Sequence, residues 1–343
     1  MKKKAAQPVS LSVIIPAYNA APWLPKTIPR VAEAVKQAGI KKAEIIVVDD
    51  GSKDDTAQVA EGLKADYPIR VITQKNGGRF VARKTGTSQA KYDFVLFIDT
   101  RIYIAPKGLQ FIVEEMKKHP ERQVWTSHVY LDKKANRYAQ FWDAITSLAW
   151  RKYFSNPRDY SYGIPEFDHF PKGTTCFFVP TKAIKAANTW FEKNTNNLKY
   201  SNDDTLLIRH IAERQNININ PKFYCTYHAR TSFKQHAKHV FHRGRVFVDG
   251  FLRRDGNRFF WPLITFLTLS ICVPIFLIFM PQFILPLVLL LLGIWLLEMP
   301  IAWLLGIPFE DAWNLTILTP VFVVFYTIGI WSGFINIFVY RKT

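Results

Sequence analysis

The sequence predicts an α/β protein in which a mainly parallel, Rossmann-like mixed sheet is followed by a helical membrane region. Two observations support this prediction. Between residues 11 and 98, four short apolar runs rich in β-branched residues alternate with segments of helical spacing. From residue 259 onward the sequence is long, apolar and nearly free of charge, which is typical of helices that cross a bilayer. The charged residues of this tail are Glu298, Glu310, Asp311, Arg341 and Lys342.

The first hundred residues set the order of the elements. We expect strands at residues 11–15, 44–48, 69–73 and 94–98, and helices at 18–39, 56–67 and 79–90. The second run is apolar throughout, as in parallel strands that are covered on both faces. Such strands form a right-handed, doubly wound sheet that binds its ligands at the carboxyl ends of the strands. Three acids stand at strand ends and are candidates for a binding site: Asp49, Asp50 and Asp99.

The middle of the chain is less regular. Residues 120–200 are rich in aromatic residues, Asn and Pro, and we expect strands at 123–131 and 175–179. A helix is expected at 203–213, with Asn202 as its N-cap. The chain is therefore divided into a basic tail at 1–10, an α/β domain at 11–228, a basic amphipathic segment at 229–258 and a membrane region at 259–343.

The membrane region contains three candidate spans, at residues 259–280, 283–306 and 315–340. The basic segment before the first span places the α/β domain on the cytoplasmic side of the inner membrane, because segments rich in Lys and Arg stay in the cytoplasm. Three spans would put Arg341 and Lys342 outside, which the same rule disfavours. A hairpin or re-entrant segment, indicated by Pro281, Pro286 and Glu298, is the alternative.

Positive charge is concentrated ahead of the membrane region. The whole chain carries a formal net charge of +18 and the tail from residue 259 carries −1, so residues 1–258 carry about +19. Such a surface suits an anionic leaflet or a phosphate-bearing ligand. Nucleic acid is not expected as a partner, because no nucleic-acid-binding motif accompanies the charge. The three cysteines, none in a Cys-x-x-Cys pattern, indicate a reducing compartment rather than a disulfide framework.

At several motifs the sequence resembles a family-2 glycosyltransferase. The resemblance covers about residues 10–250. It rests on the segments Ser12–Asn19, Val47–Ser52, Asp55-Thr56, Asn76-x-Gly78, Ala82-Arg83-x-x-Gly86, Phe97–Asp99 and Asp203-Asp204-Thr205. The resemblance implies a GT-A fold, a nucleotide-sugar donor and transfer with inversion at the sugar carbon.

The resemblance implies a donor site at the ends of the first two strands. Asp50 would offer carboxylate acceptors to the N–H groups of a nucleobase, with Tyr18 stacked on the base next to Pro16. Gly78 would let the backbone approach the ligand, and Arg83 would reach the diphosphate. The alternative is a local role for each, in which Asp50 turns the chain and Arg83 is a solvated helix residue.

Asp99 and Arg101 mark a departure from the family's pattern. The family usually has Asp-x-Asp here, and the last acid commonly binds a divalent metal that bridges the diphosphate. Arg101 takes that place in this chain, and an arginine offers no oxygen ligand. One hypothesis is that Arg101 itself neutralises the leaving diphosphate, so that metal dependence is weakened or lost. The other is that Arg101 points away and Asp99 still holds Mg²⁺ or Mn²⁺.

Asp204 is the candidate general base, and Asp203 would support it or bind the acceptor. A hydroxyl that attacks the anomeric carbon must lose its proton, and a carboxylate at a helix start can take it. The alternative is that both acids only interact with the helix dipole. Because a phosphate acceptor is already ionised and needs no base, the acid pair favours a hydroxyl acceptor. Gly173 and Thr174 lie where the family often has a small-residue segment beside the acceptor.

The basic segment carries a further set of candidates. Gln235, Arg243 and Arg245 resemble a gating segment near the diphosphate, although the aromatic residue usual in that motif is not matched. The alternative is an interfacial amphipathic helix whose cations meet lipid phosphates. A metal site is not expected at the three histidines of this segment, because their spacing drifts around a helix. These are His236, His239 and His242.

The sequence therefore predicts a membrane-anchored inverting glycosyltransferase of the cell envelope. Its partners would be a nucleotide-sugar donor, UDP-linked in the favoured interpretation, a lipid-linked acceptor and membrane lipids. The acceptor would be a hydroxyl of a lipid-linked glycan or glycolipid at the cytoplasmic leaflet. One alternative is a polyprenyl-phosphate glycosyltransferase. Another is a non-catalytic membrane scaffold that has kept the fold and lost the metal site.

Overall fold

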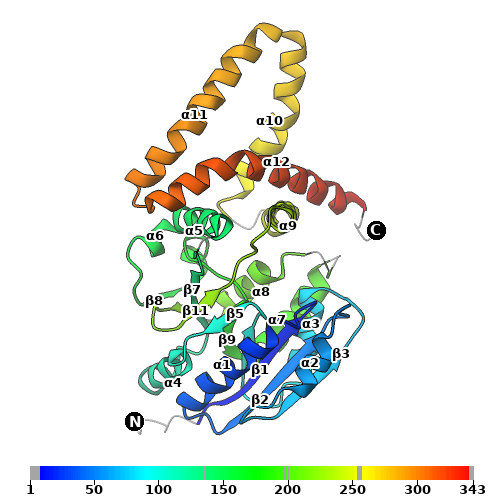
Figure 1. The fold of residues 1–343 in the computed structure, drawn as a ribbon, viewed down its shortest axis with the longest axis vertical. Helices are drawn as coiled ribbons and strands as arrows, with labels where there is room; N and C mark the ends of the chain where they lie inside the picture. Colours follow the sequence, from blue (N-terminus) through cyan, green and yellow to red (C-terminus); the bar gives the residue numbers. More distant parts are fainter. Residues whose placement is uncertain (1–7, 135, 196–197, 200, 253–256, 340–343) are drawn as a thin grey trace. The chain divides into compact units, whose positions relative to one another are not determined.

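A computed structural model describes residues 8–134, 136–195, 198–199, 201–252 and 257–339. The chain divides into two compact units (Figure 1). Unit 1 comprises residues 1–130 and 156–228, and unit 2 comprises residues 131–155 and 229–343. Residues 131–155, which the sequence analysis placed in the α/β domain, thus group with the basic segment and the membrane helices. Most of the basic tail at 1–10, together with Arg341 and Lys342, lies outside the described residues.

Unit 1 is built around a mixed eight-stranded sheet with the order β3-β2-β1-β4-β9-β6-β10-β8. The strands, in that order, are Ile69–Thr73, Lys42–Asp49, Ser10–Ala17, Phe94–Ile98, Cys176–Pro180, Trp125–Thr126, Ile217–Ile219 and Tyr160–Tyr162. The first four are parallel, β9 is antiparallel to both β4 and β6, and β8 is antiparallel to β10. The predicted mixed, mainly parallel sheet is confirmed. A second sheet contains β5 (Ile102–Ile104), β11 (Tyr224–Tyr227) and β7 (His128–Leu131).

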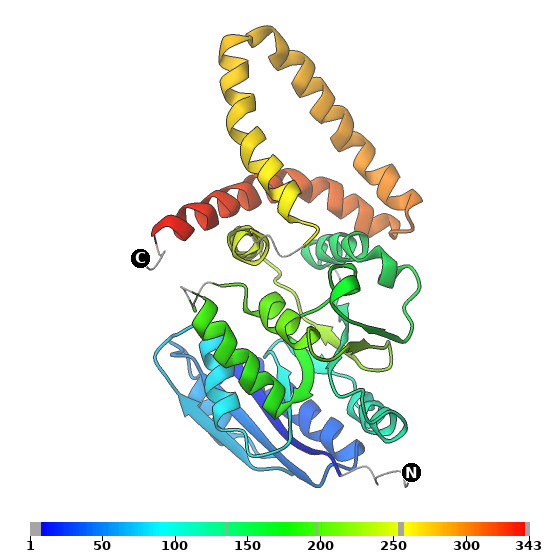
Figure 2. The same cartoon turned by 180° about the vertical axis from the view of Figure 1, so that it is seen from behind.

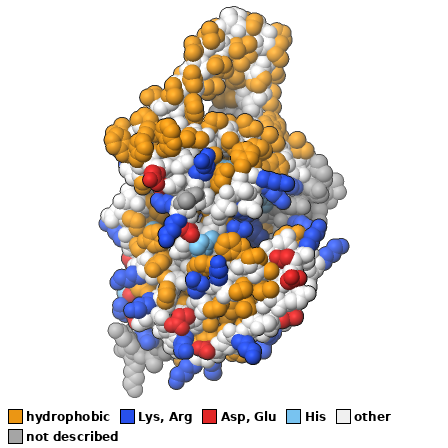
Figure 3. Space-filling view, in the orientation of Figure 1, with side chains coloured by type: hydrophobic (Ala, Val, Ile, Leu, Met, Phe, Trp, Pro, Cys, Tyr) orange, Lys and Arg blue, Asp and Glu red, His pale blue; other side chains and the backbone are white. Residues whose placement is uncertain are grey.

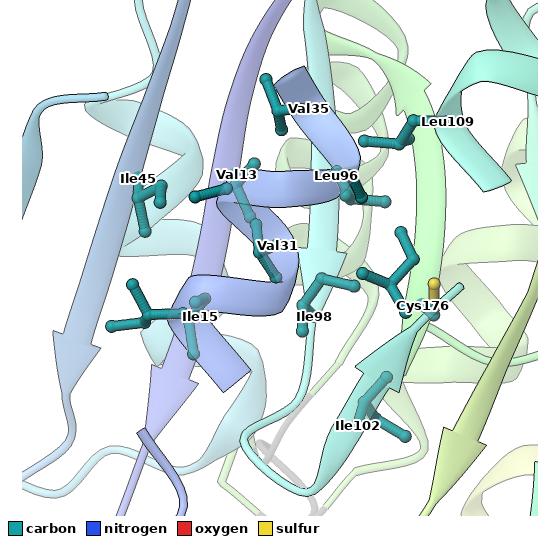
Figure 4. Packing of buried hydrophobic residues seen from close by; sticks show 14 of the residues in the cluster. Val13, Ile15, Val31, Val35, Ile45, Leu96, Ile98, Ile102, Leu109 and Cys176 are labelled. Carbon is teal, nitrogen blue, oxygen red and sulfur yellow. The ribbon is translucent and has the colours of Figure 1, made fainter. Parts of the chain in front are cut away.

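The strand β1 packs on helices through both of its faces, as its unbroken apolar character predicts. Val13 and Ile15 point toward α1 (Leu24–Gln37), where Val31 and Val35 complete a buried cluster (Figure 4). On the other face, a Cβ added at Gly86 of α3 (Arg79–Ser88) would lie 2.4 Å from Ile14 Cγ2. The close approach of α3 to β1 therefore requires a glycine at this position.

The remaining helices of unit 1 complete the layers. They are α2 (Thr56–Gly62), α4 (Gly108–Lys118), the 3₁₀ helix η1 (Ile164–His169), α7 (Thr181–Asn194) and α8 (Asp203–Ala212). Helix α7 packs beside α3 (Figure 2). Between the two helices, the ring centroids of Phe80 and Phe191 lie 4.5 Å apart. Helix α8, whose first turn carries the acid pair, packs on α7 in the same layer.

Unit 2 is helical. It contains α5 (Arg137–Ala149), α6 (Arg151–Phe154), α9 (Phe233–Phe251), α10 (Phe260–Phe279), η2 (Pro281–Phe283), α11 (Ile284–Leu304) and α12 (Phe309–Val339). By length and composition α10, α11 and α12 are each able to cross a membrane. Helices α10 and α11 form a hairpin, and α12 runs across its open end (Figures 1 and 2).

Several element boundaries differ from the prediction, each for a local reason. The helix expected at 56–67 ends at Gly62, because glycine is a poor helix former, and Leu63 is already extended with φ −79° and ψ 143°. The strand expected at 123–131 is two strands, β6 and β7, which belong to different sheets. The helix expected at 18–39 begins at Leu24, with Pro25 in its first turn.

Candidate active site

The loops that follow β1 and β2 are tied together at the carboxyl edge of the sheet. Asn19 adopts a left-handed backbone with φ 50°. Its N–H donates to Ser52 Oγ at 2.9 Å, and its side-chain oxygen accepts from the Lys53 N–H at 2.8 Å. Asn and Asp tolerate this backbone region better than most residues. Asn19 was not among the predicted site residues, although it ends a motif that carried the family resemblance.

Asp50 holds the loop that leads into α3. Its Oδ1 accepts from Gln74 Nε2 and from the Gly77 N–H, and its Oδ2 accepts from the Gly78 N–H, each at 2.8 Å. The side chain is buried. Gly78 has φ 89°, a conformation that favours glycine. A nucleobase N–H would therefore bind Asp50 as an additional donor, on a carboxylate that already fixes the loop.

Tyr18 and Pro16 lie beside this loop, where β1 ends. Tyr18 is 49% exposed, which is unusual for an aromatic residue that follows a buried strand. Pro16 pairs with Val48 in the parallel ladder. The exposed ring is available to stack on a flat ligand, as the sequence predicts for a base. That role stays a prediction.

The most distinctive feature of unit 1 is the buried guanidinium of Arg83 in α3. Its NH1 donates to Asp203 Oδ2 at 2.8 Å and to Asp204 Oδ1 at 3.1 Å, and its NH2 donates to Asp99 Oδ1 at 2.8 Å. Arg83 is 2% exposed. We refer to Arg83, Asp99, Asp203 and Asp204 as the acid cluster. The cluster joins three elements that are far apart in sequence: α3, the end of β4 and the first turn of α8.

The cluster contains more negative than positive charge, which shapes its electrostatics. Burial disfavours the charged form of Arg83, but Asp99, Asp204 and Asp203 outweigh it and raise the pKa of Arg83. Burial, together with the neighbouring Asp204, raises the pKa of Asp203, against the lowering effect of Arg79 and Arg83. Arg79 NH2 lies 3.6 Å from Asp203 Oδ1 and is half exposed. The permanent cation of Arg83 therefore favours ionised carboxylates around it.

Asp204 is held from a second side by Thr174, which precedes β9. The Thr174 hydroxyl donates to Asp204 Oδ1, the oxygen that also accepts from Arg83. Thr174 is fully buried, whereas the Asp204 side chain is 20% exposed. The predicted neighbours Gly173 and Thr174 are thus brought to the acid pair. A carboxylate that is held in place and partly exposed is suited to accept a proton from a bound molecule.

The sequence predicts that Arg83 reaches the diphosphate. In the structure its guanidinium is bonded to three carboxylates, and the role at the diphosphate stays a prediction. The residue pattern of α3 contained a signal that Arg83 faces the interior. Phe80, Ala82, Gly86 and Thr87 of α3 are all buried, so an arginine between them at helical spacing faces inward. An inward arginine needs buried acids as partners. Arg79, which lies beside Asp203, and Gln74, which donates to Asp50, carried no signal of their own.

Arg101 lies at the end of β4, two residues after Asp99. Its guanidinium stacks over the Trp23 ring at 4.5 Å, and its carbonyl accepts from the His228 N–H at 3.0 Å. Among the described residues there is no group of three or more His, Cys, Asp or Glu side chains that could hold a metal ion. Asp99 Oδ1 is engaged by Arg83, which leaves its Oδ2 as the oxygen through which Asp99 can contact a cation.

The remaining predicted residues lie in unit 2, on α9. Gln235 is in the first turn, where its N–H is capped by Ser232 Oγ at 3.4 Å. Arg243 is exposed, and its Nε lies 3.3 Å from His239 Nε2. Arg245 follows two residues after Arg243 and is half-buried. Their predicted role near a diphosphate stays a prediction.

Comparisons with known proteins identify the family of the chain. Residues 12–184, about half of the chain, match the sequence model of Glycosyl transferase family 2. The chain is 34% identical over 110 residues to the uncharacterized glycosyltransferase EpsJ of Bacillus subtilis (strain 168), a match that covers 32% of this chain and 31% of that protein. It is 34% identical over 108 residues to an undecaprenyl-phosphate 4-deoxy-4-formamido-L-arabinose transferase of Pseudomonas fluorescens (strain SBW25), a match over 31% of each. The chain spans about a third of the length of these relatives.

A solved structure is also similar. It is the crystal structure of S. aureus TarS 1-349 in complex with UDP-GlcNAc, with a TM-score of 0.45 and 18% sequence identity over 72% of this chain and 68% of that one. The family match, by contrast, includes the loops of Asn19 and Asp50, helix α3 with Arg83, and Asp99. The chain therefore belongs to Glycosyl transferase family 2, and its mixed sheet is of the GT-A type that this family implies.

Proposed function

We propose that this chain is a membrane-anchored, inverting glycosyltransferase that transfers a sugar from a nucleotide sugar to a hydroxyl of a lipid-linked acceptor. The observation that carries the proposal is the environment of Asp204. This carboxylate stands in the first turn of α8, is fixed through Oδ1 by Arg83 and Thr174, and is partly exposed. A positioned carboxylate of this kind is what a hydroxyl nucleophile requires.

In the proposed reaction, the acceptor oxygen attacks the anomeric carbon from the side opposite the diphosphate. Asp204 takes the hydroxyl proton as the new C–O bond forms. The bond between the anomeric carbon and the diphosphate oxygen breaks, and its electron pair leaves with the nucleoside diphosphate. One displacement of this kind inverts the configuration at the carbon. Arg83 touches neither substrate in this scheme, and its role is to position Asp204 and to keep it ionised.

The donor would bind at the carboxyl edge of β1 and β2. Tyr18 would stack on the base, Asp50 would accept from it, and the Gly77-Gly78 turn would face the diphosphate at the N-terminus of α3, where backbone N–H groups favour anions. Half-exposed Arg79 and the nearby Arg101 would add positive charge for the leaving group. The nucleotide is proposed to be UDP, on the family resemblance.

A divalent cation fits this site only in part. Asp99 is the residue that would hold Mg²⁺ or Mn²⁺, through Oδ2, with phosphate oxygens and water as the other ligands. A bound ion would supply positive charge to the diphosphate. Because Arg101 replaces the second acid of the usual pattern, we propose that Arg101 carries part of this task and that metal dependence is weak.

The membrane helices support an acceptor with a lipid anchor. A chain with apolar helices α10 to α12 is held at the bilayer, where lipid-linked sugars are found. The basic residues between 229 and 258 support placement of the catalytic domain on the cytoplasmic side of the inner membrane.

A second candidate function is transfer to polyprenyl phosphate itself. It is favoured by the matched relatives named undecaprenyl-phosphate transferases. The two functions differ in their need for a base, because a phosphate acceptor is already ionised. Wild-type turnover with polyprenyl phosphate that Asp204→Asn retains, together with no wild-type turnover on a glycolipid hydroxyl, would identify the second function as the correct one.

The decisive experiment uses the full-length protein in nanodiscs. A thermal-shift screen against nucleotide sugars identifies the donor, because a ligand that binds the folded state raises the Tm. Turnover is then followed as nucleoside diphosphate release for wild type, Asp204→Asn and the control Asp66→Asn, whose carboxylate pairs with Lys36 on the surface. The proposal expects Asp204→Asn to keep the donor-induced Tm shift and to lose turnover. Equal turnover in all three proteins would reject Asp204 as the base, and no shift with any donor would favour a scaffold.

A further inference from the structure

Helix α12 differs from the other two membrane helices in how much of it the protein covers. Of the residues in its most apolar stretch, 28% are buried, compared with 11% in α10 and none in the segment Pro281–Leu304. Helices α10 and α11 expose large apolar side chains on all sides, as helices surrounded by lipid do. Helix α12 is two-faced, and each of its faces indicates a different environment.

The first half of α12 is attached to the polar helix α5. Ala312, Leu315 and Leu318 pack on Phe141 and Ala144 of α5. Around this contact lies a set of polar interactions. Lys133 Nζ donates to Asp311 Oδ2 at 2.8 Å and to Asp143 Oδ2 at 3.1 Å, Gln140 Nε2 donates to Glu310 Oε2 at 3.0 Å, and Asn314 Nδ2 donates to Gln140 Oε1 at 2.8 Å. Such a network belongs near water rather than in hydrocarbon.

The second half of α12 is attached to the basic helix α9 by backbone contact. A Cβ added at Gly244 of α9 would lie 2.3 Å from the Tyr326 carbonyl oxygen. A Cβ added at Gly329 of α12 would lie 2.2 Å from the Phe241 carbonyl oxygen, and one added at Gly333 would lie 2.4 Å from that of Arg245. Glycines at these three positions let the two backbones touch, as small residues do in tightly packed helix pairs.

Helix α9 cannot itself lie within a bilayer. Its charged side chains are Lys234, Lys238, Arg243, Arg245 and Asp249, of which the two lysines and Arg243 are exposed. Each charge at the centre of a bilayer costs at least about 2.5–3.5 kcal/mol. Because α12 is bound to α5 through residues near 312–318 and to α9 through residues near 326–333, a spanning α12 would draw both charged helices into the hydrocarbon.

The opposite face of α12 is apolar and exposed. Trp313, Ile317, Val324, Ile328 and Ile335 are between 41% and 55% exposed. At about 100° per residue these five positions fall on one stripe of the helix, about 60° wide. Apolar side chains also cover the hairpin, which continues this surface (Figure 3). A helix with one face bound to charged, water-facing elements of the protein and one apolar, exposed face is suited to the plane of the membrane interface.

The hairpin supplies the crossing. Helix α10 has 20 residues and α11 has 21, each about 30 Å long at 1.5 Å per residue, which matches the thickness of the hydrocarbon. In its second half α11 is tied to α12: Thr319 Oγ1 donates to Glu298 Oε1 at 2.8 Å, and Trp295 Nε1 donates to the Thr316 carbonyl at 2.8 Å. The acid of α11 therefore lies where the hairpin meets α12, at the edge of the bilayer rather than at its centre.

We propose that this protein crosses the membrane twice, through α10 and α11, and that α12 lies in the membrane interface with its apolar stripe against lipid. The chain returns to its starting side after α11, so its C-terminus lies on the side of α9 and of the α/β domain. This replaces the three spans expected from the sequence. It also places Arg341 and Lys342 on the same side as the basic segment, in agreement with the positive-inside rule.

The first test determines which side of the membrane each position faces. The background is Cys272→Ser, which removes the exposed thiol of α10 and keeps the buried Cys176 and Cys225. Gln282→Cys at the hairpin tip, Thr343→Cys at the C-terminus and the control Glu61→Cys in exposed α2 are treated with a membrane-impermeant maleimide, in intact cells and in inside-out vesicles. We expect labelling of Gln282→Cys in cells only, and of Thr343→Cys and Glu61→Cys in vesicles only. Labelling of Thr343→Cys in cells, or failure of Gln282→Cys to label in cells, would overturn the proposal.

The second test measures the depth of α12 in the bilayer. Nitroxide labels are placed at Ile317→Cys, Val324→Cys and Ile335→Cys on the stripe, and at the control Ile294→Cys in the middle of lipid-exposed α11. Oxygen and nickel accessibility in nanodiscs gives the depth of each label. The outer two stripe positions are about 27 Å apart along the helix. If α12 is interfacial, the three stripe labels have similar, shallow depths and the control label is deep. If α12 spans the bilayer, the labels at Ile317→Cys and Ile335→Cys lie near opposite membrane surfaces and the label at Val324→Cys is deep, which would refute the proposal.

Discussion

The guanidinium of Arg83 lies 3.1 Å from the carboxylate of Asp204, although the two residues are 121 positions apart in the sequence. The same guanidinium also binds Asp203 and Asp99, at 2.8 Å each. The proposed base is thus fixed by a buried, permanently charged side chain. Changes to Arg83 should therefore affect both the stability of unit 1 and the chemistry at Asp204.

Removing the charge of Arg83 should destabilise the α/β domain strongly. Arg83→Met leaves Asp99, Asp203 and Asp204 without their central cation, and breaking a buried charge pair from one side costs about 3–5 kcal/mol. The control Lys36→Met breaks an exposed, solvent-screened pair with Asp66 and should leave the unfolding midpoint almost unchanged. Chemical unfolding followed by fluorescence in nanodiscs measures both. Similar midpoints for the two variants would contradict the importance of the cluster.

Thr174→Val should weaken the base without removing it. The variant loses the hydroxyl that donates to Asp204 Oδ1, and loss of a hydrogen bond to a charged group costs about 1.5–3 kcal/mol, or about 10-fold to 100-fold in kcat. A carboxylate that loses a donor also has a higher pKa, so the acidic limb of the kcat profile should move to higher pH. The control is Thr189→Val, whose hydroxyl bonds only within α7. An unshifted profile with normal kcat would show that Thr174 does not support the base.

Arg101→Asp should increase dependence on a divalent metal. The change restores the acid pair of the family pattern and removes the positive charge that we assign to the leaving diphosphate. Wild type is expected to lose less than tenfold of its kcat/KM in excess EDTA, and Arg101→Asp to lose much more and to recover with Mn²⁺. Complete loss of wild-type activity in EDTA, with recovery by Mn²⁺, would show that Asp99 alone is enough for a required metal.

Gly86→Ala should destabilise unit 1 through the packing of α3 on β1. The added Cβ would lie 2.4 Å from Ile14 Cγ2, inside a core that has no room for it, and overpacking of this kind costs about 1–3 kcal/mol. The control Gly62→Ala, in α2, meets nothing within 4 Å and should be neutral or slightly stabilising. The unfolding midpoints of the two variants give the comparison. Equal midpoints would show that α3 and β1 shift enough to accommodate the added Cβ without loss of stability.

His236→Phe should reduce the loss of stability in acid. The His236 ring is buried against Tyr138 at 4.7 Å, and burial, with a smaller effect of the Arg230 charge, lowers its pKa to about 4. Because the folded pKa is below the unfolded value, this histidine contributes stability above about pH 6.5 that is lost as the pH falls toward 4. A phenylalanine keeps the ring contact and does not titrate. Thermal unfolding at pH 7.5 and 5 should therefore show a smaller drop for the variant, and an equal drop would place the acid sensitivity elsewhere.

The parts of the fold that follow from short-range rules were predictable from the sequence. Strands β3 and β4 coincide with the predicted residues 69–73 and 94–98, because each is a short apolar run between turn residues. The pairing partners of the antiparallel strands were not foreseen. Strand β9 pairs with β4 across about 80 residues, and nothing in the local pattern of residues 176–180 specifies that partner.

The candidate site was predictable residue by residue but not as an arrangement. The strand ends placed Asp50 and Asp99 correctly at one edge of the sheet, since parallel strands share that edge. The contacts of Arg83 with Asp203 and Asp204 depend on how α3 and α8 meet in space, and spacing along the chain does not encode this. The chemistry of each side chain can thus be read early, whereas the identity of its partner requires the tertiary structure.

The three-element origin of the acid cluster has a consequence for biosynthesis. A nascent chain that has emerged only as far as β9 contains Arg83 and Asp99 but not the two acids of α8. Its internal cation then has one counterion instead of three. Completion of the acid cluster must wait for residue 204 to leave the ribosome, shortly before the first membrane helix is made.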